Sequence, residues 1–195
     1  MGLGASGMAV IDATNLLLLL RPETRVPAGP DGIPIDRPRE RIQFLVSKLE
    51  KEKAKIIIPT PALSEALVRA GNAASQEIIE KLQKYSVFRI ESFDTRAAIE
   101  VAAMTRKALN GGNKRGVSGA TWAKVKYDRQ IVAIARVSGA TTIYSDDDDI
   151  GALVKGTNIS VIKLKDLPLP PETAQFEMFS EDGGQNGNEN TKEET

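Results

Sequence analysis

Apolar residues along the chain fall into two alternating patterns. Short, nearly continuous apolar runs predict buried strands, at residues 8–12, 55–59, 86–91, 140–145 and 159–164. Between them apolar residues recur at intervals of three and four, which predicts amphipathic helices; these cover 38–54, 60–71, 73–85, 94–109, 123–138 and 148–155. Strands that are apolar at consecutive positions and are separated by helices are typical of a parallel sheet covered on both faces. We therefore expect a three-layer α/β/α fold with a mostly parallel sheet of about five strands.

The chain of 195 residues suits one such domain, which we place at residues 8–168. The Gly- and Ser-rich residues 1–7 predict a flexible N-terminus. Five prolines between residues 22 and 38 predict a loop, whose role is open. Residues 169–195 combine low hydrophobicity with Gly, Asn and Glu, which predicts a disordered acidic tail.

Two amino acids are missing from the composition, and their absence limits the chemistry. The chain has no cysteine and no histidine, which excludes disulfides, thiolate metal sites and a histidine general base. A metal would have to be held by oxygen atoms, which points to Mg²⁺ or Mn²⁺. The net charge is zero, but residues 171–195 hold seven acids and one lysine. The remaining body is therefore mildly basic, which is compatible with a nucleic-acid partner.

No segment predicts a membrane span or a signal peptide. The apolar stretch near the start is short and is interrupted by Asp12 and Asn15. It also lacks the basic start and the small-residue cleavage site of a signal peptide. We expect no membrane partner and a cytoplasmic protein.

Several acids follow the predicted strands. Asp12 ends the first strand, Asp147 follows the strand that ends at Ser145, and Glu65 lies early in the helix after the second strand. Parallel strands have their carboxyl ends at one edge, so these acids are expected to converge there. Two other interpretations stay open: Asp12 as a helix cap, and Glu65 as a charge that complements a helix dipole.

Asp128 lies on the apolar side of its predicted helix. Its spacing to Ile131, Val132 and Ala135 is i, i+3, i+4 and i+7. A buried carboxylate costs several kcal/mol unless it is paired, so Asp128 needs a base, a metal ion or a proton. A structural salt bridge is the alternative to a metal ligand.

Four segments together resemble the PIN domain, a nuclease fold used by VapC-type ribonuclease toxins. They are "VIDATNLLLL", "PTPALSEAL", "YDRQIVAIARVSGA" and "IYSDDDDI", and the resemblance covers roughly residues 8–165. It implies a PIN-like fold with four catalytic acids, which fall on Asp12, Glu65, Asp128 and Asp147. It also implies a Mg²⁺ or Mn²⁺ ion held by Asp12, Asp128 and Asp147, with Asp149 as an auxiliary ligand.

The resemblance assigns different roles to the four aspartates at residues 146–149. Ser145, Asp147 and Asp149 fall on the motif positions, and Ser145 would position the loop or hold a water on the substrate side. Asp146 and Asp148 are then expected to be solvated, although Asp146 remains an alternative to Asp147.

The stretch from Val101 to Tyr127 contains six bases and no acid. We expect it to face the substrate, with phosphates bound by Lys114, Arg115, Lys124 and Lys126. Trp122 would either stack on an unpaired base or pack in the core.

The leading hypothesis is a metal-dependent endoribonuclease that hydrolyses RNA, as the toxin of a toxin–antitoxin pair. The resemblance then implies an antitoxin protein and a second copy of the chain as partners. The main alternative is a PIN-like module that binds RNA or protein without cleaving. A receiver domain also uses clustered aspartates, but it needs a lysine at the end of the last strand. Lys163 lies within the last predicted strand and so does not meet this requirement. A haloacid-dehalogenase phosphatase would need an aspartate where Thr14 stands.

Overall fold

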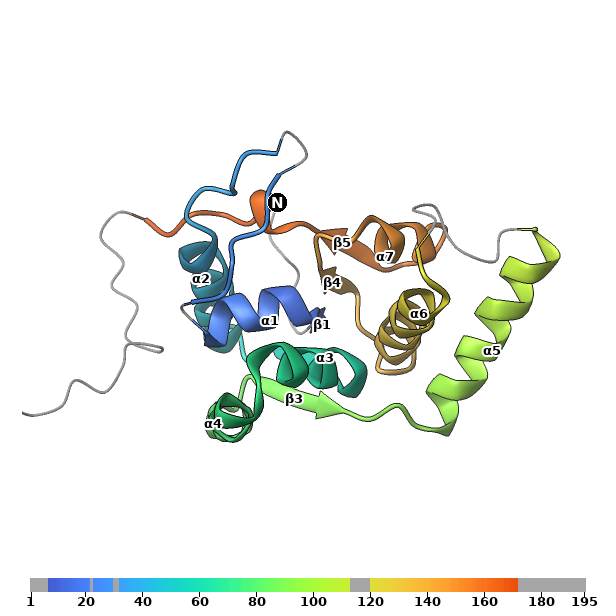
Figure 1. Ribbon diagram of the computed structural model, residues 1–195, viewed down its shortest axis with the longest axis horizontal. Helices are drawn as coiled ribbons and strands as arrows, with labels where there is room; N and C mark the ends of the chain where they lie inside the picture. Colours follow the sequence, from blue (N-terminus) through green and yellow to red (C-terminus); the bar gives the residue numbers. More distant parts are fainter. Residues whose placement is uncertain (1–6, 22, 30–31, 113–119, 172–195) are drawn as a thin grey trace, which may run out of the picture.

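The computed structural model describes residues 7–21, 23–29, 32–112 and 120–171 (Figure 1). Its sheet has five parallel strands in the order β3-β2-β1-β4-β5. The strands are β1 (Met8–Ile11), β2 (Lys55–Pro59), β3 (Phe88–Glu91), β4 (Thr142–Tyr144) and β5 (Ser160–Ile162). The predicted parallel sheet of about five strands is confirmed.

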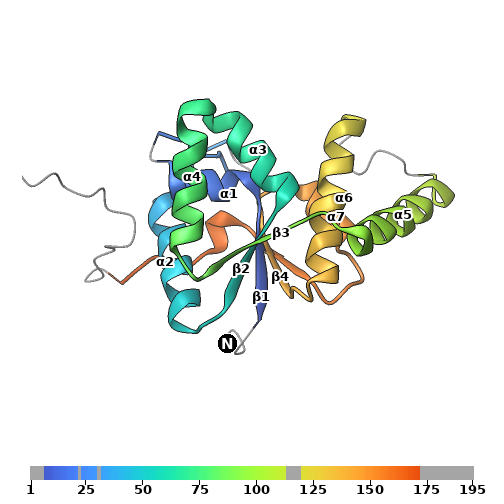
Figure 2. The same cartoon turned by 90° about the horizontal axis from the view of Figure 1, so that it is seen from below.

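Helices cover both faces of the sheet. They are α1 (Ala13–Leu20), α2 (Pro38–Lys51), α3 (Thr60–Ala70), α4 (Asn72–Lys84), α5 (Thr95–Asn110), α6 (Trp122–Val137) and α7 (Asp148–Leu153), followed by the 3₁₀ turn η1 (Leu164–Asp166). Figure 2 shows α1, α2 and α4 on one side of the strands and α5 and α6 on the other. This arrangement confirms the three layers.

The core lies on both faces of the central strands. Val10 and Ile11 of β1 and Ile56–Ile58 of β2 are fully buried. A strand that packs against helices on both faces needs apolar residues at every position, which explains the unalternating runs of the sequence. Val10 pairs in register with Ile57 and Ile143, so the carboxyl ends of β1, β2 and β4 lie at one edge.

The start of α3 differs from its prediction. The order of Thr60 and Pro61 in the sequence predicts a helix capped by the Thr60 hydroxyl, but α3 begins at Thr60 itself and has no side-chain cap. Strand β2 runs into α3 without a loop, so Pro59 occupies the N-cap position, and its side chain cannot accept a hydrogen bond. The Thr60 hydroxyl instead accepts a hydrogen bond from the Phe93 backbone N–H at 3.1 Å.

The structure tests some of the predictions on the loop, the two termini and a membrane span. The described residues between 23 and 37 form no helix and only the isolated bridge between Ala28 and Pro34, as expected for a loop. Most of the flexible N-terminus predicted at residues 1–7 and of the tail predicted at 169–195 lies outside the described residues. No helix of the described chain combines the length and apolarity that crossing a membrane requires.

The strand order excludes the receiver-domain alternative. A receiver domain has the order 2-1-3-4-5, whereas this sheet has β3-β2-β1-β4-β5. Lys163, which we expected within the last strand, follows β5 and forms an ion pair with Asp148 at 2.7 Å.

Candidate metal centre

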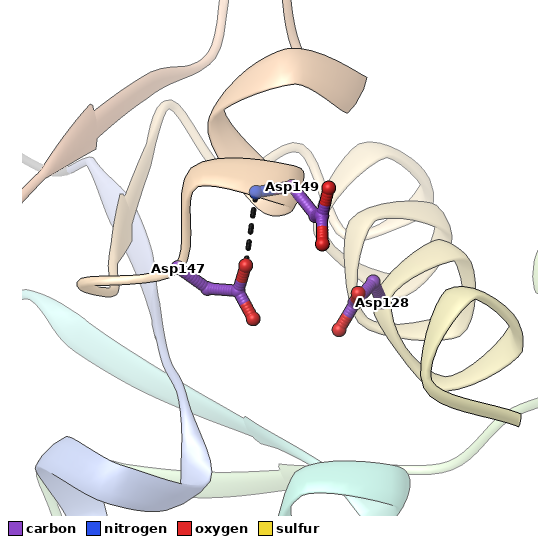
Figure 3. Close-up of side chains that lie close together, drawn as sticks. All are labelled: Asp128, Asp147 and Asp149. Carbon is purple, nitrogen blue, oxygen red and sulfur yellow. Dashed lines mark hydrogen bonds between the residues drawn. The ribbon is translucent and has the colours of Figure 1, made fainter. Parts of the chain in front are cut away.

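Three of the acids named from the sequence meet at the carboxyl edge of the sheet. Asp128 projects from α6, while Asp147 and Asp149 lie where the chain enters α7 (Figure 3). One carboxylate oxygen of each lies within 4.8 Å of the others. Asp128 and Asp149 are buried, and Asp147 is half-buried. The structure therefore gathers these three carboxylates around a single point.

Local hydrogen bonds hold two of them in place. The backbone N–H of Asp147 donates to the Ser145 hydroxyl at 3.1 Å. The Asp147 carboxylate in turn caps α7 by accepting from the Asp149 backbone N–H at 2.9 Å. Its second oxygen, Oδ2, contacts the ammonium group of Lys124 at 2.7 Å. Ser145 is fully buried, so its hydroxyl holds the Asp147 backbone from the interior of the protein.

The Lys124 ammonium lies at the centre of this group. Its Nζ is 2.9 Å from Asp128, 2.7 Å from Asp147 and 2.9 Å from Asp149. Lys124 precedes Asp128 by one helical turn on α6, which brings the two side chains to the same face. From the sequence we expected Lys124 to bind substrate phosphates, whereas in the structure its ammonium group contacts the three acids. The salt bridge that was the alternative for Asp128 is therefore present.

Burial and the surrounding charges perturb the pKa values of this group. Desolvation is the main cause that raises the pKa of Asp128 to about 6, and the charges of Asp147 and Asp149 add to it. The hydrogen bond from Lys124 works against this rise without cancelling it. For Lys124, burial disfavours the charged form, but the hydrogen bonds to the three aspartates outweigh it and raise its pKa.

Asp12 lies at the same edge but does not belong to the group of three. Its carboxylate caps α1 by accepting from the Asn15 backbone N–H at 2.8 Å. It also hydrogen-bonds to the Ser145 side chain. Ser145 thus contacts both Asp12 and the backbone of Asp147. The capping interpretation of Asp12 is confirmed, and it coexists with a position beside the cluster.

Glu65 lies near Asp12 on a more open part of the edge. Its side chain is half exposed and pairs with Arg69, one turn later on α3, at 3.6 Å. Burial raises the pKa of Asp12 to about 6, and the charges of Asp146 and Glu65 contribute to the same rise. Asp12 and Glu65 therefore influence each other electrostatically, although they stand apart from the three clustered carboxylates.

The raised pKa of Asp12 predicts a measurable pH dependence. A group whose pKa is higher in the folded state stabilises the fold at low pH and loses that contribution as the pH rises through about 6. Lowering the pH from about 7 to about 5 should therefore stabilise the metal-free protein. Asp12→Asn should gain about 1 kcal/mol less over this interval. Urea denaturation at both pH values measures the difference. An equal gain in both proteins would contradict the assignment, and the exposed Asp148→Asn is the control.

The other two acids of the run have separate roles. Asp148 is exposed and pairs with Lys163, as expected for a solvated position. The expectation that Asp146 is solvated is wrong, because its Oδ1 accepts a hydrogen bond from the Leu164 backbone N–H at 3.1 Å. Asp146 is half-buried, and this bond ties the exit of β4 to η1. Its carboxylate therefore lies away from the group of three.

The basic stretch is only partly described, since Lys114 and Arg115 lie outside the described residues. Trp122 begins α6, is half-buried, and has both Lys126 and Arg129 about 5.5 Å from its ring centroid. It is neither a core residue nor an open stacking surface in this conformation. Of the two interpretations that the sequence left open, neither describes it fully.

A cavity of about 480 Å³ opens beside the acids, between α5, α6 and α7. Asp128 and Asp149 form part of its wall, and Met104, Val125 and Leu153 supply apolar surface. Its basic residues are Lys107, Arg129, Arg136 and Lys155. No pattern in the sequence marks these residues as a group. Lys107 lies on α5, Arg129 and Arg136 lie on α6, and Lys155 follows α7, so only the packing of these helices brings them together.

Comparison of the sequence with protein-family models finds no match, and neither does comparison with curated proteins. Similar folds occur among solved structures. A chain of VapBC2 from Rickettsia felis, in a crystal structure bound to a DNA fragment from their promoter, is 13% identical with a TM-score of 0.53, over 80% of this chain and 98% of that one.

Two structures from Mycobacterium tuberculosis are more distant. VapBC-5, a member of the VapBC family of toxin–antitoxin systems, is 15% identical with a TM-score of 0.44, over 80% of this chain and 98% of that one. VapC20, a toxin that cleaves the sarcin–ricin loop, is 16% identical with a TM-score of 0.46, over 74% and 93% of the two chains. The likeness to the Rickettsia felis chain confirms the PIN-like α/β/α fold.

Proposed function

We propose that this protein is a metal-dependent endoribonuclease that hydrolyses RNA at the acidic edge of its sheet. The observation that carries the proposal is the convergence of Asp128, Asp147 and Asp149 on one point, where a cation already lies within 2.9 Å of each. Three carboxylates gathered in this way repel one another and weaken the fold unless a cation compensates them. Their convergence therefore favours a function that uses a cation.

The residues present fit a divalent ion of the oxygen-binding class. All the donors are carboxylates, which Mg²⁺ and Mn²⁺ prefer. Asp128, Asp147 and Asp149 would hold the ion, and Asp12 lies at the same edge of the sheet. Such an ion would supply positive charge to phosphate oxygens and lower the pKa of a water molecule.

The chain's own residues can handle protons and orientation. Asp12 has a pKa of about 6, so its carboxylate can accept a proton near neutral pH without a histidine. Ser145 orients both Asp12 and the Asp147 backbone through its hydroxyl. Glu65 is half exposed, and its charge acts on Asp12. We assign these residues to positioning and proton transfer.

The cavity between α5 and α7 supports a nucleotide substrate. Its volume of about 480 Å³ is within the range for small-molecule sites, and it adjoins Asp128 and Asp149 directly. Apolar walls suit a base, and Lys107 and Lys155 suit the phosphates on either side of it. We infer that one nucleotide next to the scissile bond occupies this cavity, which requires an unpaired strand.

This placement predicts a change in the salt dependence of binding. Replacing Lys107 and Lys155 by glutamine should lower the slope of log affinity against log salt by about 1.4 for single-stranded RNA. Fluorescence anisotropy at several salt concentrations, with Ca²⁺ as a non-supporting ion, measures the slope. The control is Lys48→Gln with Lys51→Gln on α2, on the other side of the sheet, which should leave the slope unchanged. An unaltered slope in the variant with Lys107→Gln and Lys155→Gln would show that RNA does not bind in the cavity.

We also propose that the enzyme acts as the toxin of a toxin–antitoxin pair. The support is the fold that it shares with a chain of the VapBC2 structure from Rickettsia felis. An antitoxin and a second copy of this chain would then be its protein partners. Co-expression with the protein encoded by the adjacent gene, followed by a growth assay, tests this role.

A PIN-like module that binds RNA without cutting is the second candidate. The observation that favours it is the position of Lys124, because an ammonium that never leaves the acids would exclude a metal ion. The two candidates differ in one measurement, which is the cleavage of single-stranded RNA by the purified protein with Mn²⁺ and with EDTA. Cleavage that requires Mn²⁺ supports the enzyme. Binding without cleavage under both conditions supports the module.

A further inference from the structure

The position of Lys124 is more specific than a surface ion pair requires. One ammonium group contacts an oxygen of each of three carboxylates, at 2.7 to 2.9 Å. These are the same three residues whose oxygens lie within 4.8 Å of one another. Within a helix, a lysine reaches the residues three or four positions away. Lys124 makes that pair with Asp128 and, in addition, two pairs across to the segment that enters α7.

The backbone at Lys124 does not need these contacts for its own structure. The Thr121 hydroxyl caps the start of α6 by accepting from the Lys124 backbone N–H at 3.3 Å. The N-terminus of α6 is therefore capped by the threonine and not by the lysine side chain. The Lys124 side chain is 41% exposed, while those of Asp128 and Asp149 are below 10%. The ammonium thus closes the cluster from the solvent side and has an open path away from it.

We propose that Lys124 is a built-in counter-ion of the metal-free site, and that a divalent ion binds in direct competition with its ammonium group. This rests on the proposed function, because it concerns the metal site of that activity. Without metal, Lys124 keeps three repelling carboxylates together. When a divalent ion binds, the ammonium moves out toward solvent, because two cations cannot share the same oxygens at this distance. Lys124 is a positioning residue of the metal-free state, and it lowers the affinity for metal.

The displaced lysine also couples the metal to RNA. An ammonium released at the mouth of the cluster lies beside the cavity that shares Asp128 and Asp149. A phosphate at that mouth attracts the released ammonium and so disfavours its return to the acids. By thermodynamic linkage, RNA then strengthens metal binding by the same factor as metal strengthens RNA binding. The expectation from the sequence that Lys124 meets phosphate applies to this second position.

The test measures Mn²⁺ affinity by isothermal titration calorimetry, without RNA, in the full chain. Lys124→Met keeps the aliphatic length and removes the charge. It should bind Mn²⁺ at least about fivefold more tightly, a factor that corresponds to about 1 kcal/mol. Lys124→Arg retains the cation and should stay near the wild type. Lys126→Met removes a charge two residues later that contacts Trp122 and not the acids, so its Mn²⁺ affinity should also stay near the wild type.

The outcomes separate this inference from the proposed function. If the wild type binds Mn²⁺ and Lys124→Met binds it no more tightly, the competition is refuted and the metal site stands. If neither protein binds Mn²⁺, both the metal site and the competition are refuted. If only Lys124→Met binds, the competition is supported in its strongest form.

The variant's folding is also informative. If Lys124→Met unfolds in EDTA and folds on addition of Mn²⁺, a cation is required at this point, as proposed. If it is unfolded with and without Mn²⁺, and Lys124→Gln is as well, then the lysine is a structural residue and the proposal is overturned.

Discussion

Asp128→Asn is expected to lower the rate of RNA cleavage by about a thousandfold, with little effect on the fold. A carboxylate that holds a catalytic cation contributes several kcal/mol to the transition state, and about 4 kcal/mol corresponds to three orders of magnitude in rate. The amide keeps the shape of the side chain but loses the charge that attracts the cation. Because burial raises the pKa of Asp128, removal of its charge does not destabilise the buried site strongly. Single-turnover cleavage of a labelled single-stranded RNA with Mn²⁺ measures the rate.

Asp148→Asn provides the matched control for this loss. Asp148 belongs to the acidic run that supplies Asp147 and Asp149, but its side chain is 82% exposed and pairs with Lys163. Asp148→Asn removes one negative charge beside the group of three without touching it, so its cleavage rate should stay within about twofold of the wild type, as for surface changes that leave the site intact. Full activity of Asp128→Asn would refute the active site. Equal losses in both variants would indicate a general effect of charge on RNA binding.

Mn²⁺ is expected to stabilise the wild-type protein by about 2.7 kcal/mol at a hundredfold excess over its Kd. For a chain of this length, such a change raises the melting temperature by about 5–10 °C. Asp147→Asn should gain much less, because its carboxylate supplies one of the three converging oxygens. Thermal melts in EDTA and in titrated Mn²⁺ measure the gain.

Asp146→Asn separates metal binding from general stability. Asp146 lies next to Asp147 in the chain, but its carboxylate accepts from the Leu164 backbone N–H. Its substitution should lower the melting temperature equally in EDTA and in Mn²⁺, so the gain on metal addition should equal that of the wild type. If Asp147→Asn gains as much as the wild type, Asp147 is not a ligand. If Asp146→Asn loses the gain instead, the ligand assignment moves by one residue.

The metal-free stability of Asp147→Asn depends on two opposing effects. Loss of the charge relieves repulsion by Asp128 and Asp149, and it also removes the contact with Lys124 at 2.7 Å. From the acids alone, relief of repulsion would dominate and stabilise the variant. The ammonium at the centre already compensates much of that repulsion. The EDTA melts of the previous experiment therefore also measure how fully Lys124 neutralises the cluster.

The sequence by itself determined the order of the elements and the edge at which the acids lie. A strand covered by helices on both faces must be apolar throughout, and a helix covered on one face must be apolar every three to four residues. Both constraints are local, and the constraint on strands appears directly in "MAVI" and "KIIIP". Once the strands are parallel, Asp12 and Asp147 must lie at the same edge. The burial of Asp128 follows equally from its spacing to Ile131 and Val132.

Only the tertiary structure decided which carboxylates meet and what lies between them. In the run of four aspartates, Asp147 and Asp149 join the cluster, whereas Asp146 accepts a hydrogen bond from Leu164, a residue 18 positions later. Lys124 reaches Asp147 and Asp149 because α6 packs against α7, and no periodicity in the sequence reports that contact. Distances between elements are set by the packing of many side chains at once. The identity of the central cation and the members of its carboxylate group therefore appeared only in the folded chain.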